Sequence, residues 1–229
     1  MNASEQIAEF LAPHQRFAGV DLCLPRLARG RDSPLQLAVT QEDPFTFPSF
    51  ALAERDARSA MHVVRLIANA VDLSKELAFP TPEDFSKQSR ARRIAVVFGS
   101  RSNHALPWVE EKARLEDLVR FEFGAEWAII GQDGRRFAMR DPSTLNREDY
   151  TASTDYGVVA RTTSPGGGSV FLLAGLGSRA TEGAGLYLFE NWRELQAQFA
   201  DRDFAVVLKF KPPVDPKKSA SVAHYSRSQ

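Results

Sequence analysis

The hydrophobic pattern of residues 51–70 is the strongest structural signal in the chain. Apolar side chains recur three and four positions apart, with charged side chains between them, which is the period of an amphipathic helix. The same spacing predicts further helices over residues 4–11, 107–119 and 186–199. Pro13 ends the first of these.

Short apolar runs between clusters of turn residues predict the strands of a sheet. They cover residues 16–25, 35–40, 94–98, 126–131, 136–140, 156–162, 170–174 and 204–210. Asp133 and Gly134 lie between two of these runs, and this dipeptide is a strong signal for a β-hairpin. Residues 165–168 are too few for a parallel crossover, so the strands on either side of them are expected to pair antiparallel.

The order of these elements predicts the fold class. Strands alternate with helices, with a hairpin region between them, which is typical of an α/β protein. We expect a three-layer Rossmann-like sandwich whose sheet is mixed and mostly parallel, with an antiparallel hairpin region. We interpret residues 1–211 as a single domain, with an N-terminal helix and edge strand in 1–33 and a Rossmann-like core in 34–211. Prolines, lysines and serines predict a disordered tail over 212–229.

Composition and charge narrow the function classes. The 229 residues are 43% hydrophobic and 25% charged, as in ordinary globular proteins. The formal net charge of +0 supplies no basic field for a nucleic acid, so such a partner is not expected. No apolar run approaches the roughly 20 residues of a membrane span, and no signal pattern opens the chain, so the expected location is cytoplasmic, without a membrane partner. The four histidines are scattered, and no metal site is predicted.

The glycine-rich turn at residues 175–185 is the first candidate site. It follows a buried strand and precedes a helix, where bare amides and the helix dipole can hold an anion. Gly175, Gly177 and Ala180 match the dinucleotide fingerprint. The match lies late in the chain, and Lys209 and Lys211 follow the next strand in place of an acidic residue, which argues against a redox dinucleotide. Another phosphate or nucleotide, or a purely structural turn, remains open.

A second polar turn, at residues 99–104, follows the strand at 94–98. In α/β folds, loops at the carboxyl ends of strands gather around ligands, and the loop at 41–50 also qualifies. The candidate ligand-binding residues of the two glycine turns are Gly99, Ser100, Arg101, Ser102, Asn103, Gly175, Gly177, Ser178, Arg179 and Thr181.

Three functional hypotheses follow. The first is a non-catalytic sensor or regulatory module that binds a nucleotide-like or other phosphorylated small molecule and acts with a protein partner. The second is a hydrolase of a nucleotide or related small molecule, with His104 as base beside Ser100 or Ser102, and with Asp43. No Gly-x-Ser-x-Gly motif supports it. The third is a scaffold that binds a protein through the aromatic loop at 45–50. The sequence names no cofactor.

Overall fold

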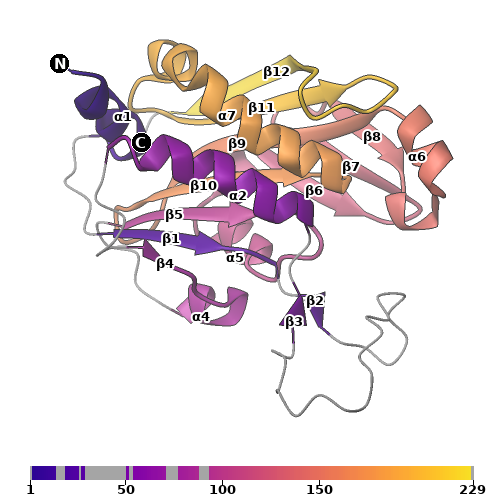
Figure 1. Ribbon diagram of the computed structural model, residues 1–229, viewed down its shortest axis with the longest axis horizontal. Coiled ribbons are helices and arrows are strands. Elements are labelled where there is room, and N and C mark those ends of the chain that lie inside the picture. The colour runs from indigo at the N-terminus through magenta and orange to yellow at the C-terminus, as the bar shows by residue number, and fades with distance from the viewer. Residues whose placement is uncertain are drawn as a thin grey trace.

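A mixed β-sheet forms the centre of the computed structural model (Figure 1). The structure describes residues 2–13, 19–25, 27–28, 50–51, 54–70, 77–87 and 93–227. Within these residues, the seven strands of the sheet lie in the order β12 (Ser219–Arg227), β11 (Asp203–Phe210), β9 (Asp155–Thr163), β10 (Ser169–Gly175), β5 (Arg93–Phe98), β1 (Gly19–Cys23) and β4 (Leu77–Ala78). The predicted α/β class is confirmed.

The expectation that the sheet is mostly parallel is wrong. β10, β5, β1 and β4 pair in parallel, but β9 pairs antiparallel with both β10 and β11, and β11 with β12. The antiparallel pairs are the longer ones. The reason is the short turn at 165–168, which folds β9 and β10 into the predicted antiparallel hairpin and leaves β9 inserted between β10 and β11.

Two further expectations at the ends of the sheet are wrong. Residues 219–227, expected within a disordered tail, form β12, because Ala223 and Tyr225 alternate inward and bury their side chains on the core. β1 was expected at the edge, but it lies between β5 and β4. The two-residue strand β4 falls in a short hydrophobic island, residues 77–80, of an otherwise polar, proline-punctuated segment, and this island is too short to predict a strand.

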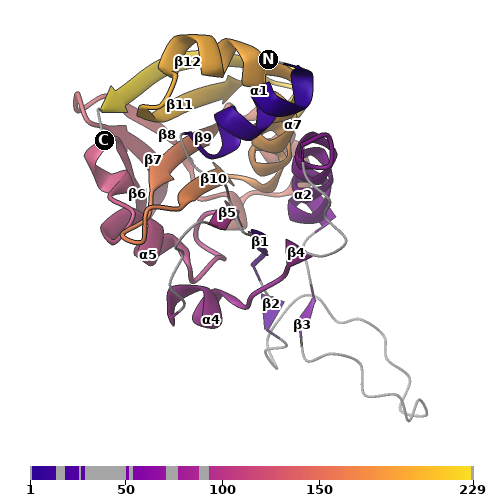
Figure 2. The same cartoon turned by 90° about the vertical axis from the view of Figure 1, so that its left-hand side faces the viewer.

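Three helices cover one face of the sheet: α1 (Ala3–Leu11), α2 (Glu54–Ile67) and α7 (Ser178–Phe199), as Figure 2 shows. Alternating strand residues such as Val96 and Phe98 point to this side and pack with the apolar faces of the helices. The helices predicted at 4–11 and 51–70 are confirmed. α7 begins eight residues before the predicted 186–199, immediately after Gly177.

The opposite face is covered by the helix α5 (Leu106–Glu111) and by a separate three-stranded antiparallel sheet. Its strands are β6 (Val119–Phe123), β7 (Glu126–Gly131) and β8 (Arg136–Arg140), and the hairpin predicted around Asp133 and Gly134 is confirmed. The prediction of a helix over 107–119 is wrong beyond Glu111, where α5 ends. Arg114 adopts a left-handed φ of 56°, and a short 3₁₀ turn, η1 (Leu115–Asp117), leads into β6.

Smaller elements complete the described chain. They are the strands β2 (Leu27–Ala28) and β3 (Phe50–Ala51), the helices α4 (Pro82–Lys87) and α6 (Arg147–Ala152), and the 3₁₀ turn η2 (Pro142–Thr144). The strand predicted at 35–40, residues 41–49 of the predicted loop, and Asp43 lie outside the described residues. No helix in the described ranges is long and apolar enough to cross a membrane.

Candidate functional site

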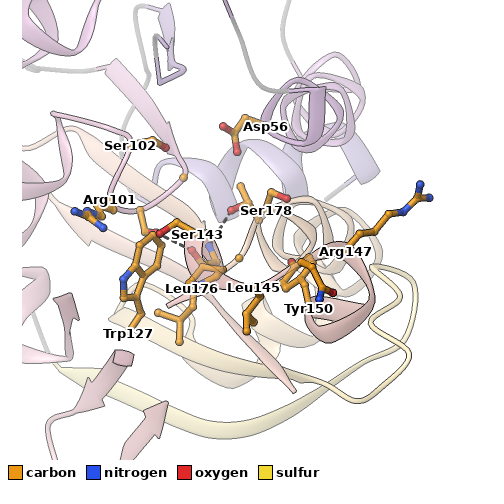
Figure 3. A pocket seen from close by; sticks show the side chains of 17 residues that line it. Asp56, Arg101, Ser102, Trp127, Ser143, Leu145, Arg147, Tyr150, Leu176 and Ser178 are labelled. Carbon is orange, nitrogen blue, oxygen red and sulfur yellow. Dashed lines mark hydrogen bonds between the residues drawn. The ribbon is translucent and has the colours of Figure 1, made fainter. Parts of the chain in front are cut away.

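The two glycine-containing turns line one cavity of about 670 Å³ at the carboxyl ends of β5 and β10. A third wall comes from residues 142–150, which include η2 and the start of α6. Asp56 from α2 and Trp127 from β7 complete the lining. Figure 3 shows Asp56 and Ser102 at one side of the cavity, Trp127 with Arg101 at another, and Arg147 with Tyr150 across from them.

A buried hydrogen bond joins the two turns. Ser100 Oγ donates to the carbonyl oxygen of Gly175 over 2.7 Å. The Gly99 amide, next to it, donates to the Leu173 carbonyl over 2.9 Å, and Gly99 has a φ of +80°, which L residues rarely adopt. The position and shape of this wall therefore depend on a glycine and on a serine hydroxyl that already has a partner.

The N-terminus of α7 was predicted to hold a ligand anion, but the protein places its own carboxylate there. Asp155 Oδ1 accepts from the Gly177 amide over 3.0 Å, and Tyr150 Oη donates to Asp155 Oδ2 over 2.7 Å. The Arg179 amide in turn donates to Tyr150 Oη over 3.1 Å. Asp155 is fully buried at the positive end of the helix dipole. The first-turn amides of Gly177 and Arg179 are therefore already engaged.

Burial raises the pKa of Asp155 to about 6. The hydrogen bonds to Asp155 act in the opposite direction and lower this pKa, because they favour the ionised carboxylate. Burial and the neighbouring Asp155 charge raise the pKa of Tyr150, so Tyr150 remains a phenol that donates its proton. Gly177 is required for this arrangement. A Cβ there would lie 2.4 Å from Tyr150 Oη and 2.6 Å from Asp155 Oδ2.

Several predicted site residues serve the protein's own fold. The Asn103 side-chain amide donates to the carbonyls of Cys23 and Phe98 over 3.1 and 2.8 Å, so Asn103 fastens the turn after β5. Thr181 Oγ1 accepts from the Gly175 amide over 2.9 Å. The Arg179 guanidinium donates to the Val214 carbonyl over 2.9 Å and does not line the cavity.

The structure separates the predicted residues into three groups. Those that line the cavity are Gly99, Ser100, Arg101, Ser102, Gly175, Gly177, Ser178 and Thr181. Those outside its lining are Asn103, Arg179 and His104, and His104 is exposed. The third group is Asp43, outside the described residues. The catalytic set proposed around His104 is therefore not assembled in the cavity.

Asp56 is the most important residue that the sequence reasoning missed. Its side chain is 4% exposed, and within the described residues it has no hydrogen-bond or ion-pair partner. Burial raises its pKa to about 6. A signal was present in the sequence: Asp56 lies four residues before Ala60 and seven before Val63, both buried, so it occupies the apolar face of α2.

The other missed residues come from segments without a recognisable motif, except Leu176, which lies in the glycine-rich turn at 175–185. They are Trp127, Pro142, Ser143, Leu145, Asn146, Arg147, Leu176 and Tyr150. Arg101 and Arg147 are exposed at the cavity, and the Arg101 guanidinium lies 5.2 Å from the centre of the Trp127 ring. The cavity thus combines exposed guanidinium groups with one buried carboxylate.

Comparisons with known proteins do not assign the chain to a family. No protein-family model matches the chain, and no curated protein matches it significantly. Within the part of the chain that the structure describes, no cluster of three His, Cys, Asp or Glu side chains could hold a metal ion.

Proposed function

We propose that this protein binds a nucleotide-like or other phosphate-bearing small molecule in the cavity between the two turns, without converting it, and that it acts as a sensor or regulatory module with a protein partner. The observation that carries this proposal is the convergence of the turns at 99–102 and 175–178 on one cavity, beyond parallel strands. This position is where Rossmann-like folds bind their ligands, and the parallel half of the sheet supports that likeness.

In this proposal, one of two exposed arginine side chains, which lie on opposite sides of the cavity, holds the phosphate. Two of the amides at the start of α7, those of Gly177 and Arg179, are engaged by Asp155 and Tyr150. The exposed guanidinium groups of Arg101 and Arg147 can each offer two parallel donors to phosphate oxygens. The hydroxyl of Ser178, exposed at the cavity, adds a neutral donor. Because the arginines are exposed, binding should weaken as salt increases.

The test is a binding titration with nucleoside monophosphates and the matching nucleosides. We expect the monophosphates to raise the melting temperature and the nucleosides to do so less. Arg101→Gln or Arg147→Gln, whichever removes the arginine that holds the phosphate, should weaken binding about fivefold, the order expected for an exposed charged hydrogen bond. Arg193→Gln is the control, an exposed arginine outside the cavity. The proposal fails if no phosphorylated compound shifts melting, or if all three variants behave alike.

A hydrolase is the second candidate, on a different set of residues from the one predicted. The Asp56 carboxylate and the Ser102 hydroxyl lie beside Gly99, 3.7 and 3.5 Å from the position that a Cβ on Gly99 would take. A carboxylate with its pKa raised toward neutrality can accept a proton from water or a hydroxyl. The test is an assay of phosphate release from a nucleotide. If Asp56→Asn abolishes the release and His104→Ala leaves it intact, the protein is a hydrolase and not a sensor.

A further inference from the structure

The unpartnered carboxylate of Asp56 indicates what the ligand must present. Figure 3 shows this side chain reaching from α2 into the cavity, on the same side as the turn that carries Ser102. A carboxylate that is 4% exposed and has no donor in the described part of the chain has lost most of its contact with water without gaining a protein hydrogen bond in return. A ligand that brings N–H donors into the cavity would supply the missing hydrogen bonds.

The position of Asp56 in the first turn of α2 does not account for its burial. An acidic residue there interacts favourably with the helix dipole. This interaction does not require burial, because Glu54 lies in the same turn and is exposed. The nearby cations have other partners: Arg58 pairs with Glu54 at 2.5 Å, and Arg55 pairs with Glu182. Burial alone raises the pKa of Asp56, and no neighbouring cation offsets it, so the carboxylate is buried without a charged partner.

We infer, resting on the proposed function, that Asp56 recognises the base of the bound nucleotide and that this base is guanine. An ionised carboxylate presents two oxygens side by side, both of which only accept hydrogen bonds. Guanine carries two adjacent donors, N1–H and the N2 amino group, on its pairing edge. Adenine and cytosine place an acceptor nitrogen beside their amino group, and the N–H of uracil lies between two carbonyls.

The arrangement of charges in the cavity suits this orientation. Asp56 is buried, whereas Arg101 and Arg147 are exposed. A guanine nucleotide would therefore place its base at the carboxylate and its phosphate at one of the solvent-exposed guanidinium groups. The cavity volume of about 670 Å³ lies within the range of natural small-molecule sites.

The experiment compares the dissociation constants of GMP, IMP, AMP and XMP by calorimetry at pH 7.5. For the unmodified protein we expect GMP to bind about tenfold tighter than IMP, which lacks the N2 amino group, because a bidentate base contact discriminates at this level. The difference in affinity between GMP and AMP should be larger than that between GMP and IMP. Asp56→Asn should weaken GMP about tenfold and strengthen XMP, because the amide nitrogen can donate to the xanthine 2-carbonyl. Glu54→Gln, an exposed change in the same helical turn, is the control and should leave the order of affinities unchanged.

The outcomes separate this inference from the proposed function. If all four nucleotides bind with equal affinity, and Asp56→Asn changes none of them, Asp56 does not read the base, while the nucleotide proposal stands. If an aliphatic amine such as putrescine raises the melting temperature and GMP does not, Asp56 serves an ammonium group and the guanine inference is wrong. If none of the four nucleotides binds, the guanine inference is wrong, whereas the proposed function fails only if no other phosphorylated compound binds either. A melting curve of Asp56→Asn at pH 7.5 confirms that the variant is folded.

Discussion

Ser100 donates its side-chain hydroxyl to the backbone carbonyl of Gly175 over 2.7 Å, although the two residues are 75 positions apart in the chain. This single bond connects the turn after β5 to the turn after β10, and so connects two walls of the cavity. Ser100 is 5% exposed, which shields the bond from water.

Replacing Ser100 with alanine should therefore destabilise the fold. We expect Ser100→Ala to lower the free energy of unfolding by about 1–2 kcal/mol, because a buried carbonyl loses its donor. Urea denaturation measures this. Ser102→Ala, at an exposed serine of the same turn, should change the unfolding free energy by less than about 0.5 kcal/mol. Equal effects of the two substitutions would contradict the role assigned to Ser100.

The cap of α7 gives a second prediction. The hydroxyl of Tyr150 donates to Asp155 and accepts from the Arg179 amide. We expect Tyr150→Phe to lower the unfolding free energy by about 1–3 kcal/mol, since Asp155 then loses a donor in a buried site. Tyr156→Phe is the control, because within the described residues the Tyr156 hydroxyl makes no hydrogen bond. A Tyr150→Phe protein as stable as this control would refute the cap.

Gly177 gives a third prediction through packing. The new methyl of Gly177→Ala would lie 2.4 Å from Tyr150 Oη, so Tyr150 and Asp155 must move apart from α7. We expect a loss of about 1–3 kcal/mol in thermal or urea unfolding. In Gly124→Ala the methyl would meet the nearest atom, the Glu126 carbonyl oxygen, at 3.8 Å, and little change is expected. Similar losses in both variants would show that close packing at Gly177 is not the cause.

The pH dependence of stability gives a fourth prediction. Burial raises the pKa of Asp56 from 3.8 to about 6. Between these values the folded protein holds the Asp56 proton more strongly than the unfolded chain does, so this group's contribution to stability is fully present below about pH 4 and is lost as the pH rises through about 6. Asp155, whose pKa is also raised by burial, acts in the same direction.

Asp56→Asn isolates the contribution of Asp56. The variant should be more stable than the unmodified protein at about pH 7.5, by at most about 3 kcal/mol for a pKa shift of about two units. The difference should become negligible near pH 3, where the aspartate is largely protonated in both states. Chemical denaturation at the two pH values measures it. A variant that is less stable at pH 7.5, or a difference that does not change with pH, would contradict the prediction.

Local sequence patterns predicted most of the elements. The helical period of residues 51–70 indicated α2, the apolar run at 94–98 indicated β5, and the Asp133–Gly134 turn indicated the β7–β8 hairpin. The short turn at 165–168 was enough to predict that β9 and β10 pair antiparallel. Such features depend on residues within a few positions of one another, so the chain carries them without any knowledge of the fold.

The sequence by itself therefore determined the α/β class, the antiparallel β9–β10 pair and the two polar turns at the ends of β5 and β10. Only the tertiary structure decided that these turns share a cavity, that Asp155 occupies the N-terminus of α7, and that Asp56 lies buried beside Gly99. The physical reason is that these contacts join residues far apart in the chain, and which of them meet depends on strand order and on how the helices pack across the sheet.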